Sequence, residues 1–161
     1  EVSHDGTDNV GFFIENGAHR FAIATDLGCI TPRVDFYMRQ AQYIMIESNY
    51  DLEMLMTGKY AEYLKARILA DNGHLDNAVT ARYISDIYSP KLSHIFLCHL
   101  SNDNNTPNIA LSTVTQPLFE KGYKIGDGSE GVTSHDADVQ IMALPRFDSS
   151  ILYILRANQK Q

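Results

Sequence analysis

The chain has 161 residues, of which 44% are hydrophobic and 20% charged, a composition typical of one soluble globular domain. Its net charge of -7 argues against a protein that grips nucleic acid over its whole surface by counterion release. No run approaches the roughly 18 apolar residues of a membrane helix, so we expect no membrane partner. Cys29 and Cys98 form no CxxC pair and are expected to be reduced thiols of a cytoplasmic protein.

The first elements predicted along the chain are two short strands joined by a tight turn. Asn16–Gly17 separates the apolar run Val10–Glu15 from the run Arg20–Thr25, and Asn-Gly between two such runs is the strongest short-range hairpin signal. His4 precedes the first strand and Asp26 follows the second. Because these two ends of a hairpin are neighbours, we expect His4 and Asp26 to lie close together.

Strands and helices then alternate along the chain. The sequence predicts helices over residues 31–42, 60–71, 76–88 and 108–120, and strands over residues 43–47 and 93–98. This alternation is typical of a layered α/β domain. Residues 121–137 are predicted as a loop or edge strand, residues 139–144 and 151–155 as two closing strands, and residues 157–161 as a disordered tail after a single domain over residues 1–156.

Three polar loops follow strand-like runs in the same sense, beginning at Asp26, Ser48 and His99. In an open α/β sheet, sites collect where such loops converge at the strand ends. A histidine and an aspartate that reach one point from different strands are suitable ligands for zinc or manganese. Taken singly, Asp26 is also compatible with a loop cap and His99 with a hydrogen-bonded structural histidine. His74, between two predicted helices, is expected to cap one of them or to line the cleft.

The order of several longer motifs indicates a family. The motifs are His4-Asp-Gly-Thr-Asp-Asn-Val-Gly-Phe-Phe-Ile, Ala24-Thr-Asp-Leu-Gly, Glu47-Ser-Asn-Tyr-Asp, Leu64-Lys-Ala-Arg-Ile, Gly73-His-Leu-Asp-Asn and Cys98-His-Leu-Ser-Asn-Asp-Asn-Asn. From about Val2 to Ile109 and in this order, the sequence resembles the second half of a metallo-β-lactamase-fold hydrolase. The branch that it resembles most is the YycJ/WalJ-like one.

This resemblance implies a fold, a reaction and a set of site residues. The fold would be half of an αββα sandwich, a mixed β-sheet flanked by helices. His4, Asp26 and His99 would bind two divalent metal ions, zinc or manganese, with Asp26 between the ions and with Asp26 and His99 as catalytic residues. The implied activity is hydrolysis of phosphodiesters by a metal-bound hydroxide, like that of a DNA exonuclease. Residues expected to orient the ligands or touch substrate are Asn49, Tyr50, His74, Asn102 and Asn105.

Two departures from the family pattern affect this interpretation. The main ligand motif, His-x-His-x-Asp-His, is absent, and Tyr50 stands where a histidine is expected. Three ligands divided between two ions leave each ion under-ligated. We therefore expect a partner, the missing N-terminal half of the same domain, encoded by the same gene or retained as a nicked fragment. Nucleic acid and further copies of the chain are other possible partners. Alternative functions are hydrolysis of a small ester, thioester or lactam, and a non-catalytic remnant or binding module.

Overall fold

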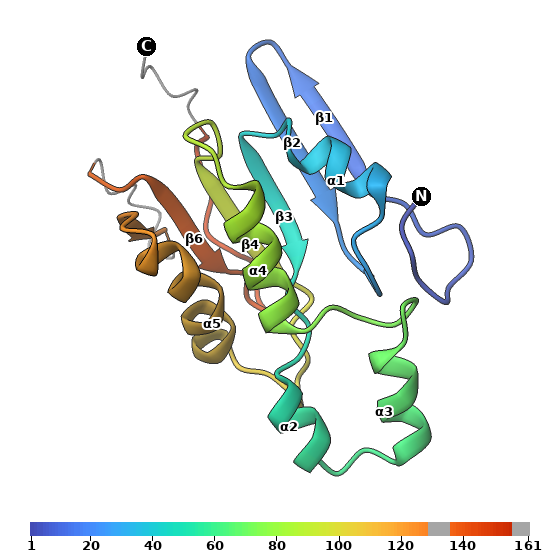
Figure 1. The fold of residues 1–161 in the computed structure, drawn as a ribbon. Helices are drawn as coiled ribbons and strands as arrows, with labels where there is room; N and C mark the ends of the chain where they lie inside the picture. Colours follow the sequence, from blue (N-terminus) through green and yellow to red (C-terminus); the bar gives the residue numbers. More distant parts are fainter. Residues whose placement is uncertain (129–135, 156–161) are drawn as a thin grey trace.

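A six-stranded mixed sheet lies at the centre of the computed structural model, which describes residues 1–128 and 136–155. The strand order is β1-β2-β3-β4-β6-β5 (Figure 1). The strands are β1 Phe12–Asn16, β2 His19–Ala24, β3 Tyr43–Glu47, β4 His94–Cys98, β5 Ile125–Asp127 and β6 Val139–Ala143. The predicted α/β class and the predicted hairpin are both confirmed, because β1 pairs antiparallel with β2 and Asn16 lies opposite His19.

The remaining strand pairs are parallel, and this places three loops at one edge of the sheet. In the register, Ala24 of β2 lies opposite Ile46 of β3, and Glu47 of β3 lies opposite Cys98 of β4. The carboxyl ends of β2, β3 and β4 are therefore adjacent. The residues that follow them converge, as the sequence predicts.

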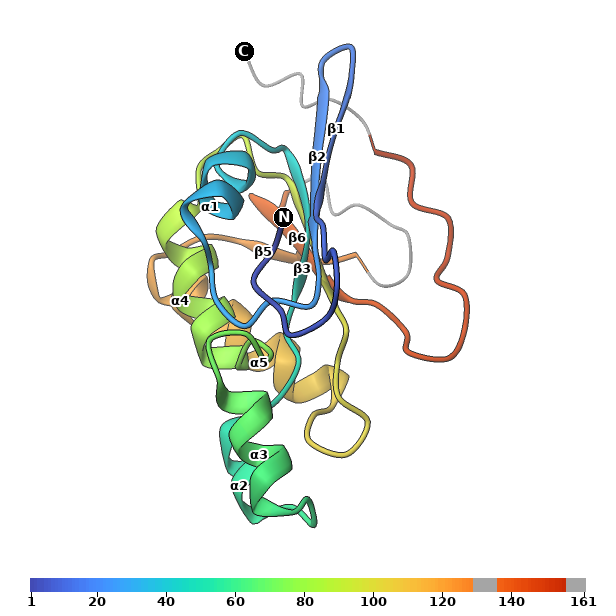
Figure 2. The same cartoon turned by 90° about the vertical axis from the view of Figure 1, so that its right-hand side faces the viewer.

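The helices begin at side-chain caps that are visible in the sequence. Thr31, Asp51, Asp76 and Thr106 each accept a hydrogen bond from a backbone N–H in the first turn of the helix that follows. The helices are α1 Pro32–Met38, α2 Leu52–Thr57, α3 Glu62–Leu69, α4 Asn77–Ile87 and α5 Pro107–Glu120. Figure 2 shows α1, α4 and α5 together on one face of the sheet. The apolar core lies between this face and those helices, and includes Ile44, Ile46, Ile95, Leu97 and Ile84.

Two elements differ from the sequence prediction. The short helix α2 was not predicted, because its six residues are too few to show the spacing of apolar residues that indicates a helix. The N-cap residue Asp51 is its one signal in the sequence. Residues 151–155 form no strand, contrary to prediction. Both edges of β6 are already paired, with β4 and β5, so this segment has no strand partner there. Instead its Tyr153 packs edge-on against Phe96, with ring centroids 5.1 Å apart.

The edge strand β5 falls within the segment predicted as a loop or edge strand. The rest of that prediction, over residues 129–135, and the predicted tail over residues 157–161 lie outside the described residues. Within residues 1–128 and 136–155, no helix is both long enough and apolar enough to cross a membrane.

Candidate metal centre

Asp26 lies two residues after the end of β2 and His99 directly follows β4, and both adopt an unusual backbone conformation. Each has a φ of 56°, in the left-handed region, which L-residues seldom occupy. The only other non-glycine residue with positive φ in the described part of the chain is Asp8. Such conformations cost about 1–3 kcal/mol each and cluster at functional sites. The surrounding structure therefore holds both side chains at this edge of the sheet at an energetic cost.

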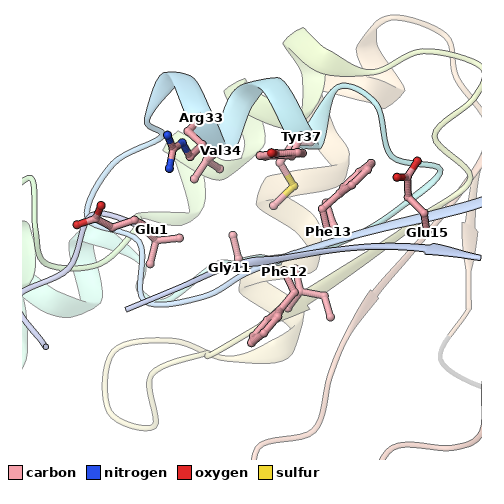
Figure 3. Close-up of a pocket in the computed structure, with 13 residues that line it drawn as sticks. Glu1, Gly11, Phe12, Phe13, Glu15, Arg33, Val34 and Tyr37 are labelled. Atoms are coloured by element: carbon pink, nitrogen blue, oxygen red, sulfur yellow. The ribbon is translucent and has the colours of Figure 1, made fainter. Parts of the chain in front are cut away.

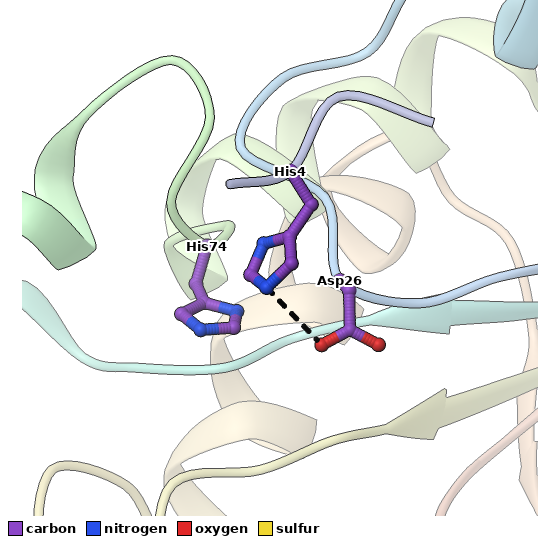
Figure 4. A group of neighbouring side chains, drawn as sticks. All are labelled: His4, Asp26 and His74. Atoms are coloured by element: carbon purple, nitrogen blue, oxygen red, sulfur yellow. Dashed lines mark ion pairs between the residues drawn. The ribbon is translucent and has the colours of Figure 1, made fainter. Parts of the chain in front are cut away.

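His4 is oriented by a backbone carbonyl so that one ring nitrogen faces Asp26. Its Nδ1 lies 3.0 Å from the carbonyl oxygen of Gly73, and because a carbonyl only accepts, Nδ1 carries the proton. The Nε2 lone pair then faces Oδ1 of Asp26 at 3.7 Å (Figure 4). A backbone carbonyl that fixes the tautomer in this way is typical of metal-binding histidines.

Two glycines allow the loops around His4 to approach each other closely. A Cβ on Gly28 would lie 2.3 Å from the carbonyl oxygen of Asp71, and one on Gly73 would lie 2.2 Å from that of Ile68. The hydroxyl of Ser3 also donates to the carbonyl oxygen of Asp71. The chain before β1 and the loop after β2 therefore both pack against the turn that carries His74. A Cβ at Gly28 would clash with this turn, and one at Gly73 would clash within the turn itself.

Glu47 is a central residue of the cluster that it forms with His4, Asp26, His74 and His99, although we did not select it from the sequence as a site residue. Its side chain is fully buried at the end of β3. Oε1 accepts hydrogen bonds from Nδ1 of His74 at 2.6 Å and of His99 at 3.1 Å, and Oε2 accepts one from the backbone N–H of Leu27 at 2.5 Å. Three donors compensate the buried charge. The available signal was a carboxylate ending an otherwise apolar strand at the edge where the loops converge.

His74 connects the other two histidines of the cluster. Its ring centroid lies 4.9 Å from that of His4 and 5.1 Å from that of His99. The potential ligand atoms of His4, Asp26 and His74 all lie within 4.8 Å of one another, and so do those of Glu47, His74 and His99. His74, predicted to orient ligands or touch substrate, is thus placed among the candidate ligands themselves.

The spacing of these atoms fits a metal ion. Two ligands at zinc–ligand distances and a tetrahedral angle lie about 3.4 Å apart. Oδ1 of Asp26 lies 3.7 Å from Nε2 of His4, whose lone pair is available to a metal ion. Nδ1 of His99 lies 3.7 Å from the same oxygen but donates to Glu47, so Nε2 is the ring nitrogen of His99 that is available as a ligand. Asp26 therefore stands between the two histidines, and imidazole with carboxylate is a donor set that suits zinc and manganese.

Nearby charges act on the protonation of His99. The hydrogen bond that His99 donates to Glu47 is the largest influence and raises the pKa of His99; desolvation and the positive charge of Arg146 oppose this rise, whereas the charges of Glu47 and Asp26 add to it. Two carboxylates on one side and an arginine on the other thus fix the electrostatic surroundings of this histidine.

Of the predicted supporting residues, Asn49 and Asn105 belong to a buried polar network beneath the cluster. Nδ2 of Asn49 donates to the carbonyl oxygen of His99 at 2.6 Å. Nδ2 of Asn105 donates to the carbonyl oxygens of Ser48 and Asn49, and to Oδ1 of Asn77. This network fixes the loop after β3 against the loop after β4, and hence the position of His99.

Tyr50 and Asn102 are placed differently. Tyr50 is buried and remains a neutral phenol, because burial, together with the charges of Asp76 and Glu47, raises its pKa to about 12. Asn102 is exposed and makes no hydrogen bond within the described part of the chain. Neither residue lines the hollow of about 250 Å³ beside the cluster, here called the cluster pocket, whose walls include His4, Asp5, His74, His99, Arg67 and Arg146.

We expect Asn105→Ala to destabilise the protein by about 1–3 kcal/mol, because buried carbonyl oxygens lose their donor. The free energy of unfolding in urea measures this change. Asn102→Ala is the matched control, since it alters an exposed asparagine of the same loop, and it should stay within about 0.5 kcal/mol of the unaltered protein. Equal stabilities of the two variants would contradict the role given to the network.

A second test uses the cysteines. Burial, with the charges of Glu47 and Asp26, raises the pKa of the Cys98 thiol to about 12. At pH 8 only about one molecule in ten thousand then carries the thiolate, the nucleophilic form. We expect iodoacetamide at pH 8 to modify the half-buried Cys29 and to leave Cys98 intact, as measured by mass spectrometry. In urea both thiols should react; equally fast reaction in the folded protein would contradict this prediction.

A larger hollow, of about 480 Å³, lies between α1 and the β1–β2 hairpin (Figure 3). Its walls include the rings of Phe13 and Tyr37, whose centroids are 5.1 Å apart. None of the clustered histidines or carboxylates lines it. The clustered histidines and carboxylates therefore lie apart from this hollow, at the carboxyl edge of the sheet.

The protein has a mixed β-sheet flanked by helices, and histidines and carboxylates gather at the carboxyl ends of its parallel strands. These features define an α/β protein with a candidate metal centre like that of a hydrolase. The chain is 35% identical to the exodeoxyribonuclease YycJ of Bacillus anthracis over 153 residues, which are 95% of this chain and 54% of that protein. It is 33% identical to the exodeoxyribonuclease WalJ of two Streptococcus pneumoniae strains over 125 residues, 78% of this chain and 46% of each relative. No family model matches, and no solved structure is significantly similar.

These similarities support the YycJ/WalJ-like branch that the motifs in the sequence indicate. The chain spans about half the length of the curated relatives that it matches.

Proposed function

We propose that the chain forms part of the active site of a metal-dependent nuclease that hydrolyses phosphodiester bonds at the ends of DNA. The arrangement of His4, Asp26, His74 and His99 carries this proposal, because it gathers imidazole and carboxylate donors on one edge of the sheet. The names of the relatives, exodeoxyribonucleases, favour DNA over a small ester, thioester or lactam.

In this proposal the cluster holds two divalent ions, zinc or manganese. His4, Asp26 and His99 would be the ligands, with Asp26 shared by the two ions, and the close approach of His74 would make it a further ligand or a substrate contact. Such ions lower the pKa of a bound water and neutralise charge on the scissile phosphate. Glu47 accepts the Nδ1 protons of His74 and His99 and so holds both rings in one orientation. The reduced thiols Cys29 and Cys98 suit the cytoplasmic location that we propose.

The proposed partner is a segment that carries His-x-His-x-Asp-His and covers the sheet face opposite the helices. Phe13 of β1 contacts Tyr37 of α1, so its neighbours Phe12 and Ile14 point to the opposite face, where both are at least half exposed. Towards the middle of the sheet the same face carries Phe21 and Phe96, with ring centroids 5.8 Å apart, and there Tyr153 packs on Phe96, which is buried. The exposed apolar side chains of β1 are typical of a face that another layer covers.

The decisive experiment combines metal analysis with DNA hydrolysis. The purified protein is measured alone and together with a polypeptide that carries His-x-His-x-Asp-His, taken from the part of the relatives outside the matched stretch. We expect about two ions per complex and manganese-dependent removal of nucleotides from end-labelled DNA, which EDTA abolishes. A folded complex that binds no metal and leaves DNA intact would support the remnant or binding-module alternative. Hydrolysis of small esters but not of DNA would support the small-substrate alternative.

A further inference from the structure

The segment that follows β6 runs beside the cluster and carries a cation that forms no ion pair with an acidic side chain among residues 1–128 and 136–155. The backbone N–H of Leu144 donates to the carbonyl oxygen of Leu97, which fixes this segment against the end of β4. Two residues further on, Nη1 of Arg146 donates to the carbonyl oxygen of Leu100, next to His99. A guanidinium has five N–H donors, so most of those on Arg146 remain available.

Arg146 differs in this respect from Arg67, the other arginine of the cluster pocket. Arg67 forms a two-point ion pair with Asp5, through contacts of 2.5 and 3.1 Å. Arg146 forms no ion pair with any residue that the structure describes. The positive charge of Arg67 is offset by Asp5, which also lines the pocket, and the whole chain carries a net charge of -7, so an anionic substrate needs further local positive charge here. Arg146 supplies that charge.

The neighbouring side chain, Phe147, adds a second recognition element. It is 80% exposed, which is unusual for so large an apolar side chain. The guanidinium carbon of Arg146 lies 5.3 Å from the centre of its ring. Both residues line a second hollow, of about 550 Å³, that also borders His99. A cation for the backbone and an exposed ring for a base are the two features with which proteins bind single-stranded nucleic acid.

We propose that Arg146 and Phe147, together the Arg-Phe pair, bind the end of a single DNA strand beside the cluster. Arg146 binds the phosphate next to the scissile one, and Phe147 stacks on the adjoining base. Guanidinium and phosphate match in charge and in geometry, since two N–H groups can reach two phosphate oxygens. This inference rests on the proposed function, to which it adds the way in which the strand is held.

The test measures DNA binding without turnover. Fluorescence anisotropy follows the binding of a fluorescein-labelled strand of about 12 thymidines to the purified protein, assembled with its partner segment, in EDTA. We expect Arg146→Gln to weaken binding about 10-fold and to reduce the dependence of affinity on salt by about one phosphate contact. Phe147→Ala should weaken binding about 5- to 100-fold with little change in the salt dependence. Arg146→Lys should restore the salt dependence and part of the affinity.

Matched controls come from exposed residues away from the cluster. Arg82→Gln on α4 and Phe36→Ala on α1 remove the same chemical groups and should leave DNA binding within twofold of the unaltered protein. Unchanged DNA binding in Arg146→Gln or in Phe147→Ala would overturn the proposed role of the Arg-Phe pair. An equal loss of DNA affinity in the control variants would overturn it as well.

Hydrolysis of bis(p-nitrophenyl) phosphate by the unaltered complex with manganese tests the proposed function separately. Failure of that reaction would count against the nuclease proposal. If the complex hydrolysed this small ester but the variants bound DNA unchanged, only the proposed role of the Arg-Phe pair would be contradicted.

Discussion

Asp26→Asn is expected to abolish most of the nuclease activity of the assembled protein. Loss of a residue that merely orients a metal ligand typically costs 10–100-fold in activity or metal affinity, and we expect more than about 100-fold for the carboxylate proposed to lie between the ions. Asparagine keeps the volume of the side chain and tolerates the left-handed backbone at this position. The loss would therefore come from the missing charge between His4 and His99 rather than from the fold.

Asp8→Asn is a well-matched control for this variant. Asp8 has a φ of 55°, nearly the same as Asp26, but it is exposed and outside the cluster. Initial rates on end-labelled DNA and metal content by elemental analysis should show Asp8→Asn equal to the unaltered protein and Asp26→Asn depleted in both. Full activity of Asp26→Asn would remove Asp26 from the proposed ligands.

Glu47→Gln is expected to have the largest effect on stability, about 3 kcal/mol of the free energy of unfolding. The amide loses the charge that three donors compensate, and its NH₂ group must face either the backbone N–H of Leu27 or the ring N–H groups of both His74 and His99. Two donors in contact inside a fully buried site cannot both be satisfied. Metal affinity should also fall 10–100-fold, because the two imidazoles lose their common acceptor.

Urea unfolding and metal titration of the same preparations test both consequences. Glu53→Gln, at an exposed position of α2, removes the same charge without touching the cluster and should change stability by less than about 0.5 kcal/mol. If Glu47→Gln unfolded at the same urea concentration as the unaltered protein and bound metal equally well, Glu47 would have no role in holding the histidines.

Several features of this protein could be predicted because their signals are local. Asn16–Gly17 predicts the hairpin, Thr31 followed by proline predicts the start of α1, and the apolar run of residues 43–47 predicts β3 with its observed bounds. Turn chemistry, capping and hydrophobic runs act within a few residues, so the sequence contains them directly. The same locality explains the wrong strand at residues 151–155, since an apolar run does not reveal whether a strand edge is free to pair.

The candidate site was predictable only in part. His4, Asp26 and His99 could be selected because each flanks a predicted strand. The structure places a ring nitrogen of each histidine 3.7 Å from Oδ1 of Asp26. Asn102 and Asn105 look alike in the sequence, yet one is exposed and the other is buried in a network. Which asparagine faces inwards depends on how the loop after β4 packs on the loop after β3, and no local pattern contains that information.

The sequence by itself determined most of the order of strands and helices, the chemistry of the residues at the strand ends and the resemblance to the YycJ/WalJ-like branch. Only the tertiary structure decided that Glu47 becomes the common acceptor for His74 and His99, which lie 27 and 52 residues further along the chain. The physical reason is that a buried carboxylate is tolerated only where donors meet it. Those donors come from three separate loops, which parallel strand pairing and the close approach at Gly28 and Gly73 bring together.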